Sequence, residues 1–152
     1  MESVTLKLVE IAASDRANVL SSIDGFDEDW WRPDHFGDDD RLYSVVEGDR
    51  VVALVAVEQN ATIAEHMNGP HAGKQAHYIS FLEVNEGARR RGVGGLSVSL
   101  VADALGGIFC AAVAPEALGA REFWRSIGWV EYPNLRFGIT ESGSFVTPCA
   151  QM

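Results

Sequence analysis

The sequence predicts an α/β protein in which one mixed sheet of about six to seven strands is flanked by about four helices. A strand, a glycine-rich turn and a helix follow one another from His77 to Leu105, and a new apolar run begins at Ile108. A strand, helix, strand order favours parallel neighbours. Two further strand-like runs are joined by the turn residues 47–49, which is a hairpin signal and favours antiparallel neighbours. Both kinds of pairing together predict a mixed sheet.

The first half of the chain supplies three strands and two helices. Residues 4–11 alternate apolar and polar side chains, which is typical of a strand. Ser14 and Asp15 are capping residues for a helix to Ile23, which Gly25 ends. Four further elements are expected: a short helix within 27–40 interrupted near Pro33, strands at 41–46 and 50–58, and a loop at 66–75.

The second half alternates strands and helices. The apolar run 77–84 and the run 108–113 predict central strands, and apolar residues at helical spacing predict a helix over 94–105 between them. A helix from about Pro115 ends at Gly128, and two closing strands are expected at 129–139 and 144–147.

Composition restricts the classes of function. The 152 residues suit one domain, 1–152, and 47% hydrophobic content argues against disorder. A net charge of -10 disfavours nucleic acid and anionic membranes as partners. No spanning segment, signal peptide or metal-ligand spacing is visible, so we expect a cytoplasmic protein without a metal.

The turn at 89–95 reads Arg-Arg-Arg-Gly-Val-Gly-Gly. Glycines let successive N–H groups point into one concavity, and the helix that follows adds the positive end of its dipole. This arrangement is typical of a phosphate site. It is neither a P-loop nor a dinucleotide fingerprint, because the required Lys-Ser/Thr and the third glycine are missing.

Here the chain resembles the GNAT acyl-CoA-dependent N-acetyltransferases. Their motif Arg/Gln-x-x-Gly-x-Gly/Ala matches Arg89, Gly92 and Gly94, and the usual Val-x-Pro approach matches Val84, with Glu86 in place of proline. Their second motif, Asn-x-x-Ala-x-x-Phe-Tyr-x-x-x-Gly-Phe, is matched in spacing by Ala117, Ala120, Phe123, Trp124, Gly128 and Trp129. The resemblance implies a GNAT-like fold.

The resemblance implies that acetyl-CoA is the co-substrate and that an amine attacks it directly. The residues it assigns to the coenzyme are Val84, Arg89, Arg90, Arg91, Gly92, Val93, Gly94, Gly95, Phe123 and Trp124. The backbone N–H near Val84 would polarise the thioester carbonyl. Because dimers are common in that family, a homodimer is compatible with this interpretation.

Two proton transfers need a residue. Glu83 is the candidate general base, with a sheet-edge or solvent-facing structural glutamate as the alternative and His77 or His71 as substitutes. Trp124 stands where the family has a tyrosine, and an indole cannot serve as a practical acid. Tyr78 or Tyr132 are the candidates that remain.

The stretch 24–40 holds eight acidic residues and one arginine, with aromatic residues between them. Acidic groups beside aromatic faces suit a cationic amine. We expect the acceptor to be bound by some of Asp27, Glu28, Trp30 and Trp31, although a solvated acidic loop is the alternative for most of these carboxylates.

Three functions follow. The first is an N-acetyltransferase that acts on a small cationic amine, the second is a protein or peptide N-acetyltransferase, and the third is an acyl-CoA-binding module without catalysis. Thioester turnover separates the third from the others, and an acceptor screen separates the first two.

Overall fold

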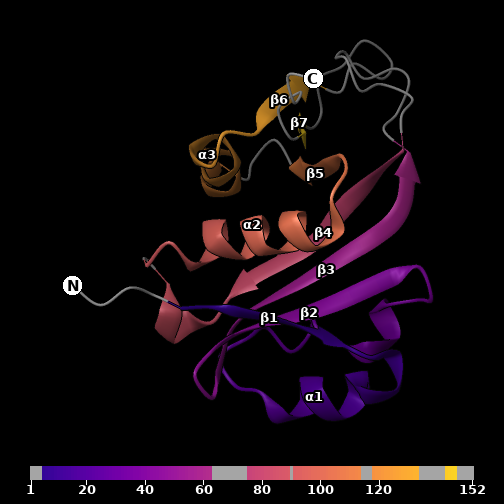
Figure 1. Ribbon diagram of the computed structural model, residues 1–152, viewed down its shortest axis with the longest axis vertical. Helices are drawn as coiled ribbons and strands as arrows, with labels where there is room; N and C mark the ends of the chain where they lie inside the picture. Colours follow the sequence, from indigo (N-terminus) through magenta and orange to yellow (C-terminus); the bar gives the residue numbers. More distant parts are fainter. Residues whose placement is uncertain (1–4, 63–74, 90, 114–117, 134–142, 147–152) are drawn as a thin grey trace. The chain divides into compact units, whose positions relative to one another are not determined.

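The computed structural model of the chain describes residues 5–62, 75–89, 91–113, 118–133 and 143–146 (Figure 1). The chain divides into two compact units, residues 1–59 with 79–106 and residues 60–78 with 107–152. The strands β3 and β4 each contribute residues to both units. The expectation of one domain over 1–152 stays a prediction.

The strands of the first unit follow the order β1-β2-β3-β4. Their bounds are Lys7–Ile11 for β1, Asp40–Glu47 for β2, Arg50–Thr62 for β3 and Gln75–Val84 for β4. β1 pairs with β2, and β2 with β3, in antiparallel fashion. Glu47 lies opposite Arg50 across the turn, where Gly48 has a φ of 63°. The predicted hairpin is therefore confirmed, because its tight turn places a glycine at a positive φ.

The helices of the first unit lie on both faces of these strands, with α1 on one face and α2 on the other (Figure 1). They are the 3₁₀ turns η1 (Ala13–Asp15), η2 (Pro33–His35) and η3 (Glu86–Ala88), and the α-helices α1 (Arg16–Ser22) and α2 (Val93–Leu105). Under α1, a core of Ile11, Trp31, Leu42, Leu54 and Ala56 is buried. Apolar side chains from α1 and β1–β3 are removed from water there, and their burial stabilises the packing of α1 on this face of the sheet.

Two expectations for this half need correction. Asp15 occupies the N-cap of α1, but its side chain makes no capping hydrogen bond. The segment 27–40 contains only the turn η2, and Pro33 begins that turn instead of interrupting a longer helix. Most of the expected loop at 66–75, including His71, lies outside the described residues.

The second unit has the strand order β4-β5-β7-β6. Its elements are β5 (Phe109–Val113), α3 (Leu118–Ser126), β6 (Val130–Pro133) and β7 (Gly143–Val146). β4 and β5 are parallel, with His77 opposite Phe109, while β5 with β7 and β7 with β6 are antiparallel. The predicted mixed sheet is confirmed. The described residues contain three α-helices, α1 to α3, where about four were expected.

Candidate active site

The turn that begins α2 presents backbone N–H groups without a side-chain cap. Gly92 is the N-cap residue, with φ 75° and ψ 12°, and no side chain accepts a hydrogen bond there. The N–H of Leu96 reaches the carbonyl of Gly92 at 3.2 Å, so the helical bonds begin with that residue. The earlier N–H groups, those of Val93 to Gly95, have no acceptor within the helix. Since the first turn of α2 carries no acidic residue, this end of the helix suits an anion.

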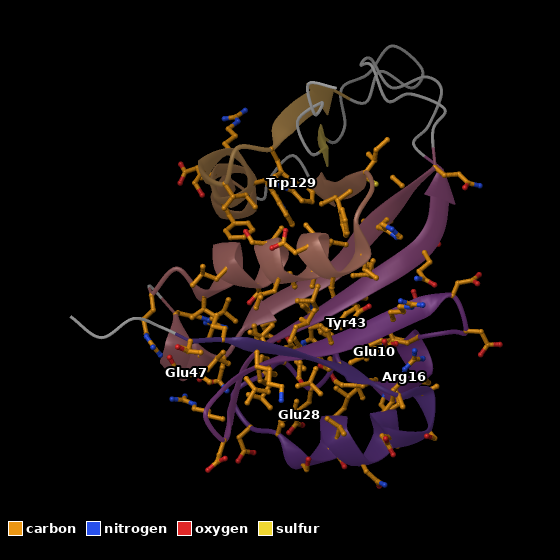
Figure 2. The ribbon with its side chains drawn as sticks, in the orientation of Figure 1. Glu10, Arg16, Glu28, Tyr43, Glu47 and Trp129 are labelled. Carbon is orange, nitrogen blue, oxygen red and sulfur yellow. The ribbon has the colours of Figure 1, made fainter. Side chains whose placement is uncertain are left out.

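Arg91 is held by the β2–β3 hairpin. Its two terminal nitrogens lie 3.0 and 2.7 Å from the two carboxylate oxygens of Glu47. The hydrogen bond from Arg91 lowers the pKa of the Glu47 carboxyl, and the same bond raises the pKa of the Arg91 guanidinium. Figure 2 shows Glu47 at the end of the sheet where the chain turns into α2. Arg91 therefore links the turn to the β2–β3 hairpin. An anion bound at the turn would have to share the Arg91 guanidinium with Glu47.

Arg89 lies closer to β4. Its Nε donates to the carbonyl of Val84 at 3.2 Å, and a terminal nitrogen lies 3.5 Å from a carboxylate oxygen of Glu83. With 55% of its side chain exposed, Arg89 keeps donors for a ligand. Arg90, the third arginine of the turn, lies outside the described residues.

The connection from β4 to α2 is tied by Asn85, which sequence analysis did not single out. Its buried amide donates to the carbonyls of Asp24 and Val51 at 2.9 and 3.2 Å. Its side-chain oxygen accepts from the N–H of Gly87 at 3.0 Å and from Arg50 at 3.2 Å. These residues border a cavity of about 600 Å³. Asn85 thus fixes the turn η3, which leads into the arginine turn.

Glu86 explains the missing proline of the family motif. Its backbone N–H donates to the carbonyl of Gly25 at 3.2 Å, and a proline has no N–H with which to make that bond. The turn is stiffened by hydrogen bonds from Asn85 and Glu86 to the loop after α1.

Glu83 is enclosed by donors. The indole N–H of Trp31 lies 2.8 Å from Oε1, and the backbone N–H of Asp27 lies 3.0 Å from Oε1 and 3.3 Å from Oε2. Arg89 is the third donor, and only 13% of the Glu83 side chain is exposed. Glu83 is therefore not the solvent-facing glutamate of the alternative interpretation.

The predicted acceptor residues have different environments. Trp31 is 4% exposed and belongs to the core, so it cannot offer a face to solvent. Trp30 is 47% exposed, and its ring lies 5.8 Å from that of Phe81. Asp27 accepts from the N–H groups of Asp29 and Trp30 and so shapes its own loop. Glu28 is exposed on the α1 side of the strands (Figure 2).

A smaller cavity, of about 350 Å³, lies beside this loop. Its lining combines carboxylates with aromatic rings: His35, Phe36, Asp38, Asp39, Asp40, Glu58 and Phe81, with Gly37 and Ser80. We call it the acidic cavity. The acidic run is visible in the sequence, but Glu58 and Phe81 were missed because they belong to β3 and β4. The pairing of Asp40 with Glu58 and the hydrogen bond from the N–H of Gln59 to the carbonyl of Asp39 bring β3 beside the loop.

His35 has a defined tautomer in this arrangement. Its Nδ1 lies 3.2 Å from the carbonyl oxygen of Trp30, which can only accept. In the neutral ring Nδ1 therefore carries the hydrogen, and Nε2 is an acceptor.

Phe123 and Trp124 lie in the second unit. The Trp124 ring is 6% exposed and packs 4.4 Å from the ring of Trp129, centroid to centroid, with Phe123 at 5.0 Å. Gly128 has a φ of 88°, and the backbone N–H of Trp129 returns to the carbonyl of Trp124 at 3.1 Å. The spacing of the second motif thus closes α3 and brings the two tryptophans together. Ala117 lies outside the described residues.

Within the described ranges, no group of three or more His, Cys, Asp or Glu side chains could hold a metal ion. None of the helices in that part of the chain is long and apolar enough to cross a membrane.

Residues 6–129 match the model of the acetyltransferase (GNAT) family. No curated protein matches the chain in sequence. Among solved structures, an acetyltransferase from Thermus thermophilus is similar, with a TM-score of 0.66 and 17% identity over 97% of this chain and 99% of that one. Arabidopsis thaliana NAA60 in complex with acetyl-CoA has a TM-score of 0.58 and 14% identity over 93% and 96%. A KacTA–DNA complex gives 0.63 and 17% over 95% and 93%. At these identities, the solved structures support the fold.

Proposed function

The chain belongs to the acetyltransferase (GNAT) family, and we propose that it transfers an acetyl group from acetyl-CoA to the primary amine of a small cationic molecule. The acidic cavity is the observation that supports a cationic acceptor. Its four carboxylates, from Asp38, Asp39, Asp40 and Glu58, attract an ammonium group, and the rings of Phe36 and Phe81 offer cation–π faces.

The turn at 89–95 is the proposed coenzyme site. Its free N–H groups, the dipole of α2 and the exposed donors of Arg89 fit a polyanion such as the pyrophosphate of acetyl-CoA. Solved neighbours support this assignment, since Arabidopsis NAA60 holds acetyl-CoA. When bound, acetyl-CoA supplies a thioester, and we propose that the backbone N–H of Val84 polarises its carbonyl.

The residues of this chain then have two tasks. The carboxylates of the acidic cavity hold the cationic acceptor, and a base removes a proton from the amine before attack. Trp124 provides no acid, so we propose that the thiolate leaves as an anion, which a thiol pKa of about 8.5 permits. The cytoplasmic location, a homodimer and the absence of nucleic-acid partners stay predictions.

The test is release of free thiol from acetyl-CoA in the presence of amines. We would compare monoamines, diamines, polyamines and peptides with free N-termini or lysines. Turnover with small polyamines supports the proposal. Turnover with peptides alone supports the peptide acetyltransferase, and coenzyme binding without turnover supports the binding module.

Matched variants separate the two sites. Glu58→Gln should raise the amine KM by roughly two- to fivefold, the range expected for one half-buried charge at a solvent-accessible site, with the KM of acetyl-CoA unchanged. The Gly92→Glu, Gly94→Glu double variant should abolish coenzyme binding in calorimetry, because two carboxylates would occupy the anion site. Asp103→Asn, an exposed change on α2, is the control.

A further inference from the structure

Glu83 is contacted by two segments that are far apart in the sequence, one through hydrogen bonds and the other through an ion pair. Trp31 and Asp27 belong to the loop after α1, 52 and 56 residues away, while Arg89 belongs to the coenzyme turn. Glu83 itself is the penultimate residue of β4. Its carboxylate therefore contacts both the predicted acceptor loop and the predicted coenzyme site.

The loop side of this junction is rigid. The Trp31 ring is buried and lies 5.9 Å from the rings of both Phe36 and Phe81, two residues that line the acidic cavity. Asp27 orients the next turn by accepting from the N–H groups of Asp29 and Trp30. A change in the position of Glu83 would therefore reach the wall of the acidic cavity through Trp31.

The turn side is loose. Arg89 approaches Glu83 at 3.5 Å, longer than either contact from the loop to Oε1, and more than half of its side chain is exposed. An anion at the turn competes with Glu83 for the same guanidinium. Ligands at the two ends of the junction would then affect each other, and such coupling is reciprocal.

These contacts also bear on the predicted base. A general base needs a lone pair directed at the proton that it removes. Both oxygens of Glu83 already accept hydrogen bonds from the backbone N–H of Asp27, and Oε1 also accepts one from the indole N–H of Trp31. We propose that Glu83 is a positioning residue that couples Arg89 of the coenzyme turn to the loop that carries Asp27 and Trp31. Only the part of this proposal that concerns coenzyme rests on the proposed function.

The first experiment needs no coenzyme. The indole N–H signals of the four tryptophans are recorded by ¹⁵N NMR, and Trp31 is assigned from its loss in Trp31→Phe, which keeps an aromatic ring. Arg89→Ala should shift the Trp31 signal through Glu83, while the control Asp103→Asn leaves it in place. The signals of Trp124 and Trp129 report that the second unit stays folded. An unchanged Trp31 signal in Arg89→Ala would overturn the coupling.

The second experiment uses steady-state kinetics. Glu83→Gln keeps an acceptor for Trp31 but removes the charge, whereas Glu83→Ala removes both. Loss of one hydrogen bond to a charged group corresponds to roughly a tenfold or larger change in an equilibrium constant. We therefore expect the amine KM to rise in the order wild type, Glu83→Gln, Glu83→Ala. The kcat of Glu83→Gln should stay within about tenfold of the wild-type value. A fall in kcat of about 10² to 10⁴ in Glu83→Gln with an unchanged KM would identify a general base and refute the positioning role.

The third experiment adds coenzyme A to the labelled protein. The Trp31 signal of the wild type should move during the titration, and the movement should disappear in Glu83→Ala. Binding that leaves Trp31 unmoved in the wild type would contradict the coupling. If the wild type binds no coenzyme, the proposed function fails, and the link from Arg89 to Trp31 is still decided by the first experiment.

Discussion

Alanine substitutions at Gly25 and Gly92 test how tightly Asn85 is fixed. Both glycines have a positive φ, 90° and 75°, so a side chain is strained at either position, by about 1–2 kcal/mol. Their surroundings differ. A Cβ at Gly92 meets no atom within 4 Å, whereas a Cβ at Gly25 would lie 2.5 Å from the side-chain oxygen of Asn85.

Asn85 cannot move aside without loss, because four hydrogen bonds hold its amide. If Gly25→Ala breaks one or two of these hydrogen bonds, the loss of unfolding free energy grows by about 1–3 kcal/mol beyond the backbone strain. We therefore expect a loss of unfolding free energy of about 1 kcal/mol for Gly92→Ala and about 3 kcal/mol for Gly25→Ala. For a domain of this size these correspond to falls in Tm of roughly 2–4 °C and 6–12 °C.

The assay is thermal and urea unfolding of the two variants side by side. The double variant Gly25→Ala, Asn85→Ala should be less destabilised than the sum of its single changes, because removal of the amide also removes the overlap. Equal melting temperatures for Gly25→Ala and Gly92→Ala, or strict additivity in the double variant, would show that Asn85 is not the obstacle.

Four further predictions concern Asn85, its neighbour Glu86, the ion pair of Glu47 and the exposed ring of Trp30. Asn85→Ala should lower the unfolding free energy by about 2–4 kcal/mol in urea titrations, since several buried polar groups lose their partner; a loss below about 0.5 kcal/mol would contradict this. The unfolding free energy of Glu86→Pro should stay within about 1 kcal/mol of the wild-type value, because the stiffer unfolded chain offsets the lost hydrogen bond to Gly25. A larger loss would show that the hydrogen bond contributes more than the stiffening and would contradict this prediction. The lowered pKa of Glu47 means that its pairing with Arg91 stabilises the fold above the pKa of the unfolded chain, roughly pH 4, and is lost as pH falls through the folded pKa. Urea titrations at several pH values should therefore show that the unfolding free energy of Glu47→Gln approaches that of the wild type in acid. A difference in unfolding free energy that stays constant with pH would refute the pairing. Trp30→Ala should change stability by less than about 1 kcal/mol but raise the amine KM severalfold, as an exposed cation–π partner would; an unchanged KM would remove Trp30 from the acceptor site.

Local signals were sufficient for much of the fold. Alternation and apolar runs placed β1 to β5 within a few residues, and the glycines at 48 and 92 have the positive φ that their turns require. The segment 27–40 was expected to hold a short helix interrupted near Pro33, but Pro33 begins the turn η2 and Trp31 packs into the core, so the segment follows an irregular course. Side-chain burial in such a segment depends on contacts that no local pattern contains.

The site was predicted only in outline. The sequence identified Glu83, Arg89 and the acidic loop as separate features, and the roles of Asn85, Glu58 and Phe81 were missed. Arg91 looked like a free phosphate ligand, but Glu47, 44 residues away, shares it. Trp31 looked like an acceptor contact, but it is a buried donor to Glu83.

By itself, the sequence determined the class of the fold, the order of its elements and the glycine turn that begins α2, because these depend on residues that are neighbours along the chain. Only the tertiary structure decided which charges are paired and which aromatic rings are buried. Hydrogen bonds across 44, 52 and 56 residues form only after β2, β4 and the loop after α1 have packed together. That packing decides whether a given carboxylate faces a ligand or holds the protein in place.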